Sequence, residues 1–227
     1  MKITYYGHSC VLVEAEGKRI IIDPFLTGNP AATVSPGDIR VDAVLLTHGH
    51  GDHFGDCIDI AKANGCPIVA VYELAEYCKS QGAEAYGMNI GGSQAFDGFK
   101  VKYTLAFHSS SLTVGDTVIY TGEPGGILLT IGDKTFFHAG DTGLFGDMRL
   151  IGEMNRIDAA ALPIGDSLTM GPEDALVAAE WLRASHVLPV HYDTFDGIRQ
   201  DASLYCERLA QKGIKGHPLK SGESFEI

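Results

Sequence analysis

The sequence predicts an α+β protein in which two sheets pack face to face with helices outside them, a four-layer αβ/βα sandwich. Three observations support this. Strand-like runs dominate both halves of the chain, and the predicted helices lie between strands rather than in a block of their own. The 227 residues are 45% hydrophobic, enough for a large core. No linker rich in Pro or Ser divides the chain, so we expect a single domain over residues 1–227.

The first half of the chain predicts an antiparallel meander and then alternating strands and helices. Continuous apolar runs bounded by Gly, Pro or charged residues indicate the strands. The expected strands are residues 2–6, 10–14, 19–23, 41–46 and 67–70. We expect helices over residues 54–63 and 73–80, and a Gly- and Pro-rich loop over 24–37.

The second half begins with β-structure and ends with strands and helices in alternation. The expected strands are residues 94–96, 100–106, 117–120, 126–131, 135–138, 158–162, 187–190 and 223–227. Helices are expected over residues 172–183 and 201–212. The first of these begins with Pro172, a residue that suits the first turn of a helix.

A histidine-rich run directly after the strand at 41–46 predicts a metal site. It reads His48-Gly49-His50-Gly51-Asp52-His53, three imidazoles and a carboxylate within six residues. Imidazoles and carboxylates are ligands for zinc and similar ions, and a strand end holds them on a rigid backbone. Other polar residues expected at or near strand ends are His8, Asp23, His108, Asp141 and His191. We expect them to meet the run at one edge of the sandwich.

Composition excludes several classes of partner. The net charge is −12 and no basic run exceeds two residues, so nucleic acid is not an expected ligand. No apolar stretch reaches 18 residues and the first residues lack a signal-peptide pattern, so we expect no membrane segment and a cytoplasmic protein. The five cysteines are odd in number and form no Cys-x-x-Cys pair, so no disulfide framework is expected.

Four segments together resemble the metallo-β-lactamase superfamily over nearly the whole chain. They are the run 48–53, residues 107–110 around His108, residues 137–143 around Asp141, and residues 188–192 around His191. The opening segments 7–10 and 22–26 are similar to the stand-alone branch of metal-dependent hydrolases related to sugar-phosphate lactonases.

The resemblance implies two metal sites. The first would be formed by His48, His50 and His108, the second by Asp52, His53 and His191, with Asp141 bridging them. This ligand set implies two divalent ions, zinc foremost, with manganese or iron as alternatives.

The implied activity is hydrolysis of a small-molecule ester, lactone or phosphodiester by a metal-bridging hydroxide. Asp52 would also orient the water or pass a proton. His8, in a turn between two strands, is a candidate substrate contact or proton donor, or else a hydrogen-bonded turn residue. Some β-lactamases of the superfamily carry Cys at the place of Asp141, so β-lactam hydrolysis is not favoured.

Two other functions stay open, a mononuclear iron dioxygenase and a non-catalytic metal-bound sensor, and so does a homo-oligomer. Around the ligands, we expect Asp23 to anchor the ligand loop and His138 to support the site from behind. Gly140 and Gly143 are expected where a Cβ would be blocked. The loops 109–111 and 121–126 are candidates for substrate binding or ordinary turns.

Overall fold

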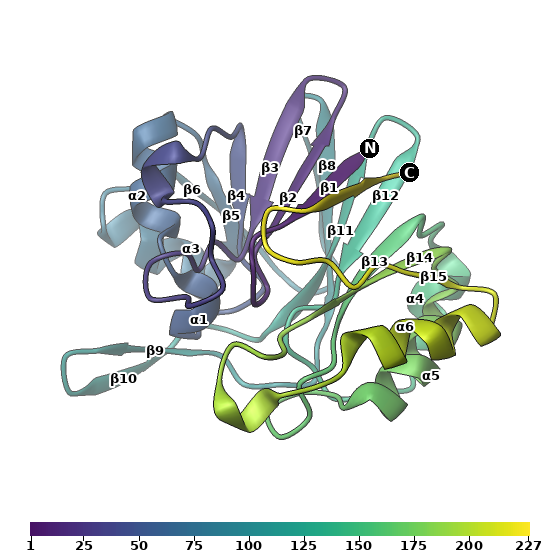
Figure 1. The fold of residues 1–227 in the computed structure, drawn as a ribbon. Helices are drawn as coiled ribbons and strands as arrows, with labels where there is room; N and C mark the ends of the chain where they lie inside the picture. The colour runs from purple at the N-terminus through teal and green to yellow at the C-terminus, as the bar shows by residue number, and fades with distance from the viewer.

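Two seven-stranded sheets lie face to face in the computed structural model, which describes residues 1–227 (Figure 1). Helices α1, α2 and α3 lie outside one sheet, and α4, α5 and α6 outside the other. The predicted αβ/βα sandwich is therefore confirmed. No helix combines the length and the apolar character that crossing a membrane would require.

The first sheet is antiparallel at one side and parallel at the other. Its order is β16 (Ser224–Glu226), β1 (Lys2–Tyr5), β2 (Val11–Ala15), β3 (Lys18–Ile22), β4 (Ala43–Leu45), β5 (Ile68–Val71) and β6 (Ala85–Met88). Its helices are α1 (Gly51–Phe54), α2 (Cys57–Asn64) and α3 (Tyr72–Ser80). Parallel pairing from β3 to β6 needs crossovers: a loop over residues 23–42 joins β3 to β4, whereas α2 and α3 lie in the crossovers from β4 to β5 and from β5 to β6.

The second sheet has the order β15 (Lys215–Gly216), β14 (His186–Val190), β13 (Ala159–Pro163), β12 (Lys134–His138), β11 (Gly125–Ile131), β8 (Phe99–Leu105) and β7 (Ser93–Phe96). Its helices are α4 (Met148–Met154), α5 (Pro172–Leu182) and α6 (Ala202–Gln211). A separate hairpin of β9 (Ser111–Val114) and β10 (Thr117–Tyr120) projects from the body (Figure 1).

Strand periodicity divides the core into layers. In β13, Ala159 and Ala161 belong to the core between the sheets, whereas Ala160 and Leu162 belong to the core under the helices. Successive side chains of a strand point to opposite faces, so a strand buried on both faces is apolar throughout. This explains why the strand at 158–162 lacks the polar alternation of a surface strand.

The prediction of one helix over 54–63 is wrong at its beginning, because Phe54 ends the separate helix α1 and α2 begins only at Cys57. The chain breaks at Gly55, which has a φ of 42°. A Cβ at this position would lie 2.4 Å from the carbonyl oxygen of Pro24, so only glycine fits there. Elements β6, β9, α4 and β15 were not predicted, because they are short and lack strong periodicity.

Candidate metal centre

The site forms where several strands and their following loops meet at one edge of the sandwich. His8 follows β1, Asp23 follows β3 and the run 48–53 follows β4. His108, Asp141 and His191 follow β8, β12 and β14 of the second sheet. The seven ligands expected from the sequence therefore come from both sheets, and the structure brings them together.

Possible ligand atoms form three clusters, of which one joins Asp23 to His48 and His53 and the other two hold the expected ligands other than Asp141. Of these two groups, His48, His50 and His108 make up one, and Asp52, His53 and His191 make up the other together with His8. Within each group the atoms that could bind a metal all lie within 4.8 Å of one another. The division matches the two ligand sets that the resemblance implies.

Asp141 lies between the groups. Its Oδ2 is 3.0 Å from Nε2 of His191 and 3.7 Å from Nε2 of His108. Its Oδ1 is 3.2 Å from Nε2 of His53. Ligand atoms bound to one zinc ion at about 2.0–2.2 Å in tetrahedral geometry stand roughly 3.3–3.6 Å apart. The carboxylate thus has the spacing of a ligand shared by both groups.

Several buried polar atoms of this cluster have no hydrogen-bond partner. They are Nε2 of His53, Oδ1 of Asp141 and both ring nitrogens of His191. Such atoms are rare in folded proteins because an unpaired buried polar group is costly. A cation bound among the Nε2 atoms would satisfy all of them except Nδ1 of His191, which lies on the opposite side of its ring. The residues present therefore fit a metal.

Asp23 sets the orientation of two of these histidines. Its carboxylate accepts hydrogen bonds from the backbone N–H of Thr47 at 2.8 Å and from the Thr47 hydroxyl at 2.6 Å. It also accepts one from Nδ1 of His53 at 2.8 Å. With its hydrogen donated to Asp23, the Thr47 hydroxyl accepts from Nδ1 of His48 at 3.0 Å. With Nδ1 engaged in each ring, Nε2 is the atom that both imidazoles turn toward the cluster, where a metal would bind it in place of a proton. The expected anchoring role of Asp23 is confirmed.

Charges in the cluster act on its titratable groups. Burial opposes the charged form of Asp141, but the imidazoles of His53 and His191 outweigh this and hold its pKa well below the usual range. Burial lowers the pKa of His48 well below its ordinary value, and the neighbouring His53 adds to the shift. Asp141 is thus an anion and His48 a neutral imidazole, the forms in which each can bind a metal.

Three residues of the site have left-handed backbone conformations. The φ angles are 54° for His8, 49° for Asp23 and 53° for His191. This conformation costs a non-glycine residue about 1–2 kcal/mol. Such strain is concentrated at functional sites, where the surrounding structure holds the side chains in place.

His8 is completely buried, so it offers no surface to a substrate. Its Nε2 lies 3.0 Å from Oδ2 of Asp52 and its Nδ1 lies 2.9 Å from the hydroxyl of Thr194. Burial lowers the pKa of His8 to about 4. Of the roles considered for this residue, the structure favours the hydrogen-bonded one over a direct substrate contact.

His138 lies behind the ligands, as expected. Its Nδ1 accepts a hydrogen bond from the backbone of Gly140 and its Nε2 donates one to the carbonyl of Ser9. Gly140 has a φ of 62°, and a Cβ there would lie 2.7 Å from Cβ of Thr47. The expectation for Gly143 is wrong, since a Cβ there would make only ordinary contacts with Phe107, at 3.6 Å from its ring and 3.8 Å from its carbonyl oxygen.

Replacing Gly140 by Ala should therefore destabilise the protein by about 2–4 kcal/mol, through backbone strain and a clash with the loop that carries His48. Gly143→Ala is the matched control and should change stability by no more than about 0.5 kcal/mol. Urea denaturation of both variants measures the difference. Equal stabilities would show that the loop yields to the extra methyl group.

The loops 109–111 and 121–126 support the ligand run from the other side. The hydroxyl of Ser110 accepts from the backbone N–H of Gly49 at 3.1 Å and lies 2.8 Å from the hydroxyl of Thr121. The backbone N–H of Gly125 donates to the carbonyl of Thr47. Ser110 and Thr121 lie in the two loops considered for substrate binding, whereas Thr47 and Thr194 were not expected at the site. Thr47 carried a signal, because it directly precedes the histidine run.

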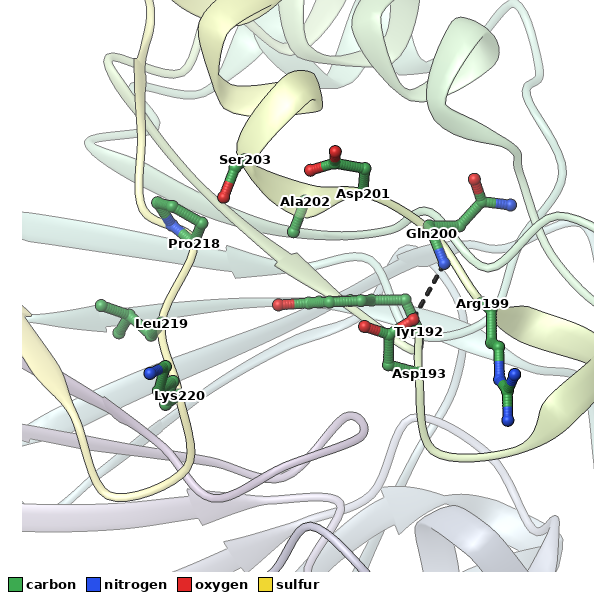
Figure 2. Close-up of a pocket in the computed structure, with 10 residues that line it drawn as sticks. All are labelled: Tyr192, Asp193, Arg199, Gln200, Asp201, Ala202, Ser203, Pro218, Leu219 and Lys220. Carbon is green, nitrogen blue, oxygen red and sulfur yellow. Dashed lines mark hydrogen bonds between the residues drawn. The ribbon is translucent and has the colours of Figure 1, made fainter.

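The largest cavity lies elsewhere. It has a volume of about 630 Å³ and is lined by residues such as Tyr192, Asp193, Arg199 and Lys220 (Figure 2). None of the seven expected ligands lines it, although Tyr192 directly follows His191. The candidate centre is therefore marked by its converging ligand atoms rather than by a large hollow.

Comparisons with known proteins agree with this geometry. Residues 2–191 match the family model of the β-lactamase superfamily domain. A protein of Geobacillus thermodenitrificans named as a metal-dependent hydrolase is 55% identical over 228 residues, with both chains covered completely. A similarly named protein of Bacillus cereus is 52% identical over 229 residues, again with complete coverage.

Solved structures show the same fold. Igni18, described as a metallo hydrolase from Ignicoccus hospitalis, superposes with a TM-score of 0.90 at 36% identity, covering 100% of this chain and 98% of that one. An isothiocyanate hydrolase from Delia radicum gut bacteria has a TM-score of 0.79 at 24% identity, covering 100% and 99%. At that identity the second likeness concerns the fold alone.

Proposed function

Because this chain belongs to the metallo-β-lactamase superfamily, we propose that it is a metal-dependent hydrolase with a binuclear centre. The observation that carries the proposal is the position of Asp141, whose Oδ2 lies near His108 of one group and near His191 of the other, while its Oδ1 lies near His53. The unpartnered buried nitrogens of His53 and His191 support it. The names of the relatives, which are metal-dependent hydrolases, agree with the reaction class.

The proposed ligands are those given by the two groups. His48, His50 and His108 would hold one ion, Asp52, His53 and His191 the other, and Asp141 both. Zinc is the first choice for so many imidazoles, with manganese or iron as alternatives. Bound there, such ions would lower the pKa of a water molecule and polarise the bond to be cleaved.

The residues of the chain prepare this chemistry. Asp23 and Thr47 hold the rings of His48 and His53 with their Nε2 atoms toward the cluster. Asp52 has a partly exposed carboxylate and is the candidate to orient water or accept its proton. All five cysteines are buried away from solvent, so no exposed thiol offers a competing nucleophile. We propose a small ester, lactone or phosphodiester as substrate, with lactones first because of the resemblance to lactonases.

Elemental analysis of protein purified without chelator, together with a panel of these three substrate classes, tests the proposal. We expect about two equivalents of zinc or manganese and turnover of at least one class. One equivalent of iron, with oxygen consumption and no hydrolysis, would instead indicate the dioxygenase alternative. Two bound ions with no turnover across the panel would favour the sensor.

A further inference from the structure

His8 could serve the second metal group in either of two ways. Its Nε2 lies close enough to Asp52, His53 and His191 to be a fourth ligand. It could instead hold Asp52 while that carboxylate binds the metal. The two roles differ in whether the Nε2 of His8 is free, so the hydrogen bonds of its ring decide between them.

Both ring nitrogens of His8 are occupied. Nε2 is 3.0 Å from Oδ2 of Asp52, and this is the one side-chain hydrogen bond that Asp52 makes. Nδ1 is 2.9 Å from the hydroxyl of Thr194. By contrast, Nε2 of His53 and Nε2 of His191 make no hydrogen bond, although each lies near an oxygen of Asp141, at 3.2 Å and 3.0 Å. A metal would satisfy those two atoms, whereas it would have to displace an existing hydrogen bond at His8.

The partners of His8 also set its tautomer. An ionised carboxylate only accepts, so Nε2 carries the hydrogen and donates it to Asp52. Complete burial disfavours the charged imidazolium, so Nδ1 is then an acceptor. The Thr194 hydroxyl is 2.9 Å from Nδ1 and 3.3 Å from the carbonyl of Tyr192, and its one hydrogen goes to the closer acceptor.

Backbone contacts hold the His8 ring rigidly. Its carbonyl accepts hydrogen bonds from the backbone N–H of His191 at 2.8 Å and from the hydroxyl of Tyr5 at 3.1 Å. The rings of His8 and His191 pack with centroids 4.1 Å apart. His8 is therefore fixed to the strand end that carries His191, and a donor fixed in this way can determine where the Asp52 carboxylate lies.

We propose that His8 is a positioning residue for the second metal. Its Nε2–H holds the carboxylate of Asp52, and Thr194 fixes the tautomer of its ring. This inference rests on the proposed function, because it takes Asp52 as a ligand. Residues that hold metal ligands in this way typically contribute 10–100-fold to metal affinity. The hydrogen bond spans 44 positions of sequence and the contact with Thr194 spans 186.

Zinc titration of the full chain against a chromophoric chelator tests this role, with Asp52→Ala identifying which binding step belongs to the second group. His8→Asn tolerates the left-handed backbone but is too short to reach Asp52. It should weaken the second zinc by about 10–100-fold and leave the first unchanged. Thr194→Val should weaken the same step, whereas Thr194→Ser, which keeps the hydroxyl, should bind zinc as the wild type does.

The double variant His8→Asn/Asp52→Ala separates positioning from ligation. If His8 acts through Asp52, adding His8→Asn to Asp52→Ala should change zinc affinity by less than about twofold, because coupled residues are not additive. A further tenfold loss would identify His8 as a ligand and overturn the proposal. Should His8→Asn fail to fold, the Thr194 pair decides, and equal affinities of Thr194→Val and wild type would contradict it.

The result separates this role from the proposed function. A wild type that binds two zinc ions, with neither His8→Asn nor Thr194→Val altering the second, contradicts the role of His8 alone. A wild type that binds no second zinc overturns both the binuclear centre and the role of His8.

Discussion

Replacing Asp141 by Ala should lower hydrolytic turnover by at least a hundredfold and reduce the metal content from two equivalents to one or none. Asp141 is the carboxylate that faces both ligand groups, with Nε2 of His191 at 3.0 Å in one group and Nε2 of His108 at 3.7 Å in the other. Residues that merely hold ligands in place contribute about 10–100-fold, so a shared ligand should contribute more. Steady-state kinetics and elemental analysis of the same preparation measure both effects.

Asp133→Ala is the matched control, because Asp133 lies exposed in the turn between β11 and β12 and makes no hydrogen bond through its side chain. It should keep wild-type turnover and metal content. Circular dichroism should show the native fold in both variants. Unchanged activity of Asp141→Ala in a folded protein would contradict the proposed binuclear centre.

Removing the metal with a chelator should abolish turnover and lower the melting temperature. An ion at one hundred times its Kd stabilises the folded state by about 2.7 kcal/mol. For a chain of this length, that corresponds to roughly 5–10 °C in Tm for each ion. Without the ions, Oδ1 of Asp141 and the Nε2 atoms of His53 and His191 stay buried without a hydrogen bond. Calorimetry before and after dialysis against the chelator gives the shift.

Zinc or manganese added back should restore both Tm and turnover. Calcium is the control ion and should restore neither, because it prefers oxygen ligands and the two groups are dominated by imidazole. A melting temperature that does not respond to the chelator would mean that these residues hold no structural or catalytic ion.

The sequence predicted the layers and most elements because apolar runs reveal buried strands wherever they occur. The prediction from sequence failed where a contact with backbone far away along the chain determines where an element begins or ends. The break at Gly55 depends on Pro24, 31 residues away, and nothing in the local pattern of residues 54–63 reports that contact. The expectation for Gly143 failed for the same reason, since its neighbour Phe107 leaves room for a side chain.

The candidate ligands could be named from the sequence because their chemistry and their places near strand ends are local properties. The spatial arrangement of these ligands could not be predicted in the same way. Residue types alone leave open which atoms lie together and which are already hydrogen-bonded. His8 looked accessible as a turn residue, yet the fold buries it between Asp52 and Thr194.

The sequence by itself determined that this chain forms a sandwich of two sheets with a set of metal-binding side chains near strand ends. The family resemblance already implied two ligand sets with Asp141 between them, but only the tertiary structure decided the distances among those atoms and that His8 contacts Asp52 rather than solvent. The physical reason is that hydrophobic periodicity acts within an element, whereas hydrogen-bond partners and ligand distances depend on how separate strands pack.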